Sequence, residues 1–262
     1  MGNPIFLAQD LSLYSLSATS SDASYPLINL KTYLARDKWK SAVLTSPQNL
    51  VIDFTIARVC DAIVLQNHNF NSIGLGSGDS LALQYADDPG FSAGAGNAKI
   101  WSNGETITDP VYVTFTSQTK RYWRLRFTKS GGLTGYPALG NLFLGLKLDF
   151  GTPYNMPARV NRDGYKTSLF TAIEGTIRST QTFGSRRNWG FGFKAGNAMN
   201  STVRSNLTTF IQTVRGMLRP FYLIDIDDSI NYVHMMNDID EGTISHPSLH
   251  EIDIVLATQL TF

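Results

Sequence analysis

The chain has 262 residues, enough for two domains of ordinary size, each with its own core. Charged residues make up 16% of the sequence and the formal net charge is +1, which argues against a nucleic-acid binder driven by electrostatics. The single cysteine, Cys60, excludes an internal disulfide framework, and its apolar neighbours predict a buried thiol.

The beginning of the chain carries no basic segment and no long apolar run. We therefore expect neither a signal peptide nor a membrane span, and we expect the protein to fold and assemble in a cytoplasm.

Six short strands are predicted in the first 150 residues, at the spacing of an all-β sandwich. Glycine-rich turns separate them, and no long helix is expected in this region. The glycine run at 74–78 precedes a strand and not a helix, so it is predicted to be a loop and not a phosphate-binding site. The predicted strands cover residues 49–56, 62–65, 80–85, 111–116, 121–127 and 142–149.

The strand at 121–127 has an aromatic and basic face opposite its apolar face. The first face carries Tyr122, Arg124 and Arg126. Such a face can stack sugars or grip phosphates. The other interpretation is a sandwich strand whose polar face is solvated or salt-bridged, and the alternation alone favours this second one.

Several short motifs follow one another in this half of the chain. They are Pro26, Asn29-Leu30, Trp39-Lys40-Ser41, the strand at 50–54, Asp61 to Leu65, His68-Asn69, Arg121 to Leu125 and Gly140 to Gly145. Together they resemble the discoidin-like, or galactose-binding-like, jelly roll over roughly residues 10–150. In that family the Trp-Lys-Ser turn and the Tyr-Trp-Arg-Leu strand pack the sandwich, and ligands sit on loops at one rim.

Two features of this resemblance bear on function. Secreted members of the family often close the sandwich with a disulfide, which the lone Cys60 cannot form, and this disfavours an extracellular lectin. The pair His68-Asn69 after the second strand is similar to variants found in tailed-phage virion proteins.

Residues 151–157 have the composition of a short linker, and the charge balance changes beyond them. Residues 159–219 contain ten Lys and Arg against two acids, a net charge of +8, whereas residues 220–262 contain eight acids and no Lys or Arg, a net charge of −8. Neighbouring strands of opposite charge in one sheet would explain this segregation. A subunit that stacks its positive flank on the negative flank of the next copy would also explain it.

A helix is predicted over residues 201–215, between strands at 188–194 and 221–226. Asn200 or Ser201 offers an N-cap oxygen, Arg215 falls in the last turn, and Gly216 can take the left-handed position after the helix. One apolar stripe runs along it, formed by Val203, Leu207, Phe210, Ile211 and Val214. With strands at 165–171, 174–183 and 251–262, the pattern predicts an antiparallel sheet with one helix laid across it.

A second resemblance is carried by segments of the last third of the chain. They are Arg187-Asn188-Trp189, the helix, the segment from Gly216 to Phe221, the acids at 225–228 and the last strand. They are similar to the tail-tube-like domain of phage distal tail and baseplate proteins, here over residues 158–262. The predicted fold class is therefore mainly β. It comprises an N-terminal jelly-roll sandwich over 1–150 and a C-terminal antiparallel β-sandwich or split barrel with one α-helix.

The resemblance implies a structural protein of the virion tail that assembles as a homo-oligomeric ring of six copies. The ring would join the tail tube protein to baseplate hub and fibre proteins, and DNA would pass through its lumen. The basic flank at the subunit contact would be formed by Arg178, Arg186, Arg187, Arg204, Arg215 and Arg219. The acidic flank, partly lining the lumen, would be formed by Asp225, Asp227, Asp228, Asp238, Asp240 and Glu241.

No catalytic, cofactor or metal site is predicted, and we expect no enzyme. His246 and His250 lie four residues apart beside Glu251, but no third zinc ligand is near. The acids at 225–228 lack the spacing of an EF-hand. Paired carboxylates and a G-x-S-x-G elbow are also missing.

Three functions remain open. The favoured one is the tail ring. The second is a carbohydrate-binding module that attaches a virion or a host enzyme to surface glycans, with Trp39 and Trp101 as candidate rim aromatics. The third is a metal-dependent hydrolase, which would need zinc at His250.

Overall fold

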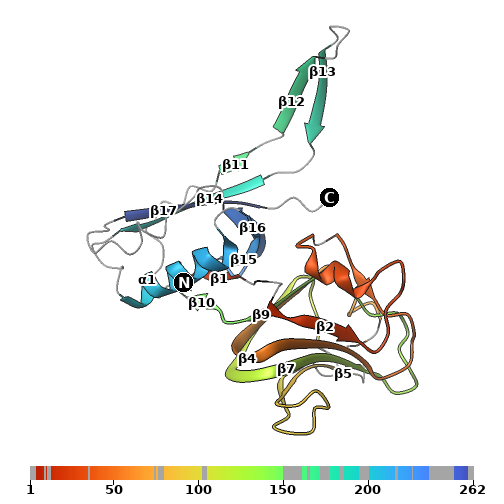
Figure 1. The fold of residues 1–262 in the computed structure, drawn as a ribbon. Helices are drawn as coiled ribbons and strands as arrows, with labels where there is room; N and C mark the ends of the chain where they lie inside the picture. The colour runs from red at the N-terminus through yellow and green to blue at the C-terminus, as the bar shows by residue number, and fades with distance from the viewer. Residues whose placement is uncertain are drawn as a thin grey trace. The chain divides into compact units, whose positions relative to one another are not determined.

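The computed structural model (Figure 1) describes residues 4–8, 10, 13–34, 36–73, 75, 80–101, 105–149, 161–163, 166–171, 177–182, 186–194, 201–215, 218–225, 227–235 and 251–258. The predicted fold class is confirmed: the chain is mainly β, with antiparallel sheets and one α-helix among the described residues. Residues 7–147 form one compact unit, and the remaining described residues form another. Of the described helices, none has the length and apolarity needed to cross a bilayer.

The first unit is a β-sandwich built around two long strands. These are β4 (Gln48–Gln66) and β7 (Val111–Thr128), which pair antiparallel along most of their length. The sheet order is β2-β4-β7-β5-β6, and β9 also pairs with β4. The other strands are β2 (Ser15–Ala18), β5 (Ser80–Ala86), β6 (Gly96–Trp101) and β9 (Asn141–Gly145), and β3 (Trp39–Lys40) pairs with β8 (Ala138–Leu139).

Alternating side chains of these strands enclose a single core. On β4, Leu50 and Ile52 are fully buried, and on β7 the same holds for Trp123 and Leu125. These residues and Leu144 of β9 belong to one apolar cluster, so the two halves of β4 contribute to the same interior. Burial of large apolar side chains is the main driving force for such a sandwich.

Two pairs of predicted strands prove to be continuous. The strands expected at 49–56 and 62–65 are both parts of β4, and those at 111–116 and 121–127 are both parts of β7. The ladder continues through the polar middle because backbone hydrogen bonds do not require apolar side chains. Register shifts between Asp53 and Arg58 and between Cys60 and Ala62 accommodate the change of face.

The predicted strand at 142–149 is divided, and strands β3, β6 and β8 were not predicted. Residues 141–145 form β9, whereas Leu148–Asp149 form β10 in the other unit. The sequence of β6, GNAKIW, does not alternate between apolar and polar residues, so the pattern gave no indication of a strand there.

The second unit contains a seven-stranded sheet in the order β10-β1-β15-β16-β17-β14-β11. A separate two-stranded ladder joins β12 to β13. Strands β11 and β16 were not predicted. The strands are β1 (Ile5–Leu7), β11 (Asn161–Asp163), β12 (Lys166–Thr171), β13 (Ile177–Thr182), β14 (Arg186–Lys194), β15 (Phe221–Ile224), β16 (Ile230–Met235) and β17 (Glu251–Thr258).

The beginning of the chain belongs to the sheet of this second unit. Strand β1 lies between β10 and β15, and Phe6 pairs with Leu148. The first compact unit therefore begins at residue 7 and ends at residue 147. We had expected the first domain to run from residue 1 to residue 150. The predicted linker at 151–157 lies outside the described residues.

Helix α1 (Ser201–Val214) confirms the predicted helix and its buried stripe. Leu207, Phe210, Ile211 and Val214 are all at least 96% buried. The ring of Phe210 lies 5.0 Å from that of Phe6 in β1 and 4.7 Å from that of Phe221 in β15. The helix thus packs on the sheet where the first strand has entered it.

The end of α1 differs from the prediction by one residue. The helix ends at Val214, and Arg215 takes the left-handed conformation, with φ of 51°. Gly216, for which we predicted this conformation, lies outside the described residues. The backbone N–H of Arg219 then donates to the Val214 carbonyl at 3.0 Å and closes the helix end. A side chain with a Cβ in this conformation costs about 1–2 kcal/mol.

Replacing Arg215 with Gly is therefore expected to stabilise the helix end by about 1 kcal/mol, because glycine carries no Cβ. Hydrogen exchange of the amides at 207–214 would measure the gain. Arg215→Ala is the matched control, since it removes the charge and keeps the Cβ. Equal exchange in both variants and the wild type would contradict this account.

Candidate functional site

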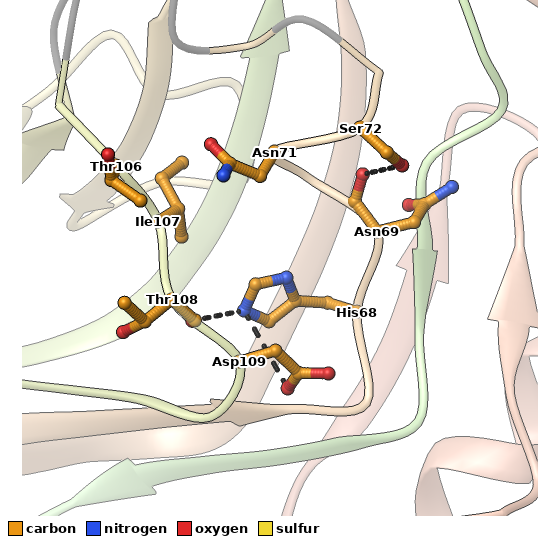
Figure 2. Close-up of a pocket in the computed structure, with 8 residues that line it drawn as sticks. All are labelled: His68, Asn69, Asn71, Ser72, Thr106, Ile107, Thr108 and Asp109. Carbon is orange, nitrogen blue, oxygen red and sulfur yellow. Dashed lines mark hydrogen bonds and ion pairs between the residues drawn. The ribbon is translucent and has the colours of Figure 1, made fainter.

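A cavity of about 520 Å³ lies between the segment that follows β4 and the segment that precedes β7. Leu65 at the end of β4 pairs with Val111 at the start of β7, so the two segments begin side by side. The lining residues, shown in Figure 2, are His68, Asn69, Asn71, Ser72, Thr106, Ile107, Thr108 and Asp109.

His68 connects the two segments. Its Nε2 lies 2.9 Å from the Thr108 carbonyl oxygen, which only accepts, so Nε2 carries the proton. Its Nδ1 accepts from the Phe70 backbone N–H at 3.4 Å, and the two rings stack with centroids 4.4 Å apart. The side chain is 1% exposed. Both ring nitrogens are therefore occupied, and His68 holds the wall of the cavity.

The surroundings of His68 favour the neutral imidazole. Burial lowers its pKa below the ordinary value, and the positive charge of Lys38 acts in the same direction. The carboxylate of Asp109, 3.9 Å from Nε2, and the hydrogen bond to Thr108 act in the opposite direction but do not outweigh burial.

Asn69 fixes the same wall from behind. Its side-chain amide donates to the Tyr136 carbonyl at 2.9 Å and accepts from the Ala138 backbone N–H at 2.9 Å. Its own carbonyl accepts from the hydroxyl and the N–H of Ser72. These bonds tie the cavity to β8, so the lining is preformed and does not depend on a ligand for its shape.

Other polar groups of the lining remain available. Within the described part of the chain, the Asn71 amide and the Thr106 hydroxyl have no hydrogen-bond partner, and both residues are exposed. Figure 2 shows the Asn71 amide directed toward the segment that carries Thr106 and Ile107. Asp109 accepts from the Asn67 N–H through Oδ1, and its side chain is 39% exposed. The cavity therefore offers an amide, a hydroxyl and one carboxylate to a ligand.

Asp109 is the one carboxylate among the residues that line the cavity. Over the residues that the structure describes, no group of three His, Cys, Asp or Glu side chains is placed to hold a metal ion. His246 and His250 lie outside those residues.

The two tryptophans expected at a sugar-binding rim are buried. Trp39 is 0% exposed and Trp101 is 1% exposed, so neither can offer a face to a ligand. Trp39 packs against Phe127 in the core, with ring centroids 6.3 Å apart. The expectation that these tryptophans lie at the rim is therefore wrong. Their large rings are buried in the sandwich core, where they contribute apolar contact area.

Two arginines of β7, Arg124 of its polar face and the neighbouring Arg121, have partners within the sandwich, as the second interpretation expects. Arg121 makes two hydrogen bonds to the Asp53 carboxylate, at 2.7 and 3.0 Å, and holds the pKa of that carboxyl below its usual range. Arg124 donates to Gln84 at 2.7 Å and lies 4.0 Å from the Phe91 ring centroid. These arginines are engaged within the sandwich itself.

The basic residues predicted for a subunit contact are spread over several elements of the second unit. Arg178 lies in β13, Arg186 and Arg187 lie in β14, and Arg204 lies in α1. Arg219 donates to the Thr213 carbonyl at 3.0 Å, and Arg215 ends the helix.

The first three acids of the predicted lumen lie at one hairpin turn. Asp225 and Ser229 are bridged by a backbone hydrogen bond of 3.0 Å between β15 and β16, and Asp228 has φ of 61°. The Asp227 carboxylate accepts from the Ser229 N–H. These acids thus shape a turn, while Asp238, Asp240 and Glu241 lie outside the described residues.

Cys60 is fully buried, as predicted. Burial raises the pKa of its thiol to about 12, so the thiolate is not available at neutral pH.

Asn71, Thr106 and Asp109 were not singled out from the sequence. They come together because β4 and β7 pair. Strands predicted one by one from the sequence do not show which strands pair, and therefore do not show which loops become neighbours. Only His68-Asn69 had been noted, through a resemblance and without a role.

No protein-family model and no curated protein matches the chain. Three similar solved structures are carbohydrate-binding modules, and each covers about half of this chain. They are chitosan-binding module 1 of a Paenibacillus sp. IK-5 chitosanase/glucanase (17% identity, 52% of this chain, 98% of that chain, TM-score 0.42), a Clostridium perfringens CBM32 module solved with GalNAc-β-1,3-galactose (11%, 53%, 99%, 0.42), and a C. perfringens family 32 module solved with galactose (16%, 53%, 98%, 0.41). At these values the likeness carries no argument about a ligand.

The neutral state of His68 predicts how stability depends on pH. Because its folded pKa lies below the unfolded value of 6.5, the contribution is fully present above pH 6.5 and is lost as pH falls through the folded pKa. Urea unfolding between pH 7 and 5 should show this loss for the wild type and a smaller loss for His68→Gln. NMR should find the proton on Nε2, and an imidazolium at pH 6.5 would contradict the account.

Proposed function

We propose that the first unit binds a saccharide in the cavity between His68 and Thr106. The observation that carries this proposal is the unpaired Asn71 amide and Thr106 hydroxyl above a lining fixed by His68 and Asn69. An amide and a hydroxyl both donate and accept, which is what the hydroxyl groups of a sugar require. The role is attachment to glycans, without turnover.

The size and stiffness of the cavity support the same proposal. Its volume of about 520 Å³ lies within the range of small-ligand sites. Because the supporting hydrogen bonds already exist, ligand binding would cost little conformational entropy for ordering the wall.

The double variant Asn71→Ala/Thr106→Ala is expected to weaken binding of the strongest hit on a glycan array about tenfold or more, since two hydrogen bonds are lost. Isothermal titration calorimetry with that oligosaccharide would measure the change. Thr116→Ala, at an exposed position of β7, is the matched control and should bind like the wild type. Unchanged binding by the double variant would exclude this cavity as the site.

For the second unit we propose a different role, assembly into a ring of the virion tail tip. Among the described strands, β12 and β13 pair only with each other. A two-stranded hairpin alone in water is marginally stable, so strand pairing or packing with a second copy would stabilise it. The outer strands of the seven-stranded sheet, β10 and β11, leave further edges for such contacts.

Only part of the charge segregation in the sequence is available for contacts between copies. Lys194 faces Glu251 across the β14–β17 ladder, and Asp163 faces Arg186 across the β11–β14 ladder. Some oppositely charged residues are therefore register partners within one chain. The remaining charges would set the direction of stacking between copies. Such a ring of six would contact the tail tube and baseplate hub or fibre proteins, with DNA in its lumen.

Native mass spectrometry of the full chain tests this second proposal. We expect a closed oligomer, with six copies as the expected number, that dissociates when salt is raised, because charge attraction is screened. Deleting residues 166–182 should reduce assembly and leave glycan binding intact. A monomer at high concentration and low salt would contradict the ring.

A further inference from the structure

A second group of side chains borders the proposed saccharide site. The Lys40 ammonium lies 4.9 Å from the ring centroid of Tyr136 and 5.5 Å from that of Tyr25. The two tyrosines are 39% and 44% exposed, so each keeps part of its ring open to solvent. Lys40 belongs to β3, and the tyrosines belong to the segments before η2 (Leu27–Lys31) and before β8.

This group, which we call the tyrosine–lysine cluster, is connected to the cavity through Asn69. Asn69 lines the cavity and donates to the carbonyl of Tyr136. It also accepts from the N–H of Ala138, which is the register partner of Lys40 in the β3–β8 ladder. The cluster and the cavity therefore lie on the same end of the sandwich and share one wall.

Among the described residues, the cation of the cluster has no carboxylate partner. Over the described residues, Lys40 forms no ion pair, whereas Lys99 pairs with Glu105 and Lys120 pairs with Asp87, each at 2.7 Å. Lys120 also lies 5.8 Å from the centroid of Tyr85, so it resembles Lys40 in its contact with an aromatic ring but differs in having an anion. The anion-binding capacity of Lys40 is thus unused.

A second cation lies toward the cavity. Lys38 is two residues from Lys40, and its charge acts on the His68 ring in the cavity wall. Its backbone carbonyl is held by the Asn29 side chain at 2.8 Å, which fixes this part of the rim. Lys38 and Lys40 therefore add positive charge near the wall formed by His68 and Asn69, and Asp109 is the one carboxylate of the lining.

We propose that the tyrosine–lysine cluster is a subsite that selects acidic saccharides. An oligosaccharide bound in the cavity would extend over Asn69. Its next sugar unit would then lie against Tyr136, and the carboxylate or sulfate of that sugar unit would contact Lys40. Tyrosine rings pack against the apolar face of a sugar, and an ammonium forms charge-assisted hydrogen bonds with such anions. This inference rests on the proposed saccharide site and specifies its ligand.

The test compares one glycan in three forms: N-acetyllactosamine, its sialylated form and its 6-sulfated form. Calorimetry with the full chain should give about tenfold tighter binding to an acidic form, and the form preferred identifies the anion. In Lys40→Gln this preference should disappear while binding of uncharged N-acetyllactosamine stays within twofold. Lys40→Arg should retain the preference because it keeps the charge.

Lys120→Gln is the matched control, since it removes an equal charge from a lysine that lies over a tyrosine and has its own carboxylate partner. It should keep the preference for the acidic form. Equal binding of all three forms by the wild type, or a preference that survives Lys40→Gln, would overturn the subsite and leave the saccharide cavity standing. Binding of none of the three would count against both.

Discussion

The pairing of β4 with β7 is the interaction on which the described site depends. The two strands span 19 and 18 residues, and their ladder runs from Gln48 opposite Phe127 to Leu65 opposite Val111. At one end this ladder brings together the segments that form the cavity. Along its length it places Trp123, Leu125 and Ile52 in the core. A slip of one residue would turn these side chains outward and separate the cavity walls.

The cavity divides its polar residues into two kinds. His68 and Asn69 have their side-chain hydrogen-bonding groups engaged, because each joins two segments of the chain. Asn71 and Thr106 project from those segments without such partners in the described structure. A binding site requires both kinds, since groups that contact a ligand discriminate well only when the wall behind them is fixed.

Part of this architecture could be predicted from the sequence. The period-2 alternation located β5, β14, β15 and both halves of β4 and β7, and the apolar stripe with Phe210 located the helix, because burial of side chains imposes these periods. The continuity of β4 and the placement of β1 in the second sheet could not be predicted, since each depends on pairing between distant segments. The left-handed Arg215 was not predicted because the next residue in the sequence is a glycine, which takes that conformation at lower cost. Trp39 and Trp101 were assigned to a rim because a sequence does not show which side of a strand or turn faces the core.

The central claim is that a saccharide binds between Asn71 and Thr106, and NMR titration of the full chain tests it most directly. The account predicts that an oligosaccharide selected on a glycan array shifts the side-chain amide signals of Asn71 and the backbone signals of Thr106 and Asp109. Arg124 pairs with Val51, far along the β4–β7 ladder from Leu65 and Val111 where the cavity segments begin, so its signals and those of Phe91 beside it should stay in place. Shifts at Arg124 and Phe91 without shifts at Asn71 would contradict the account.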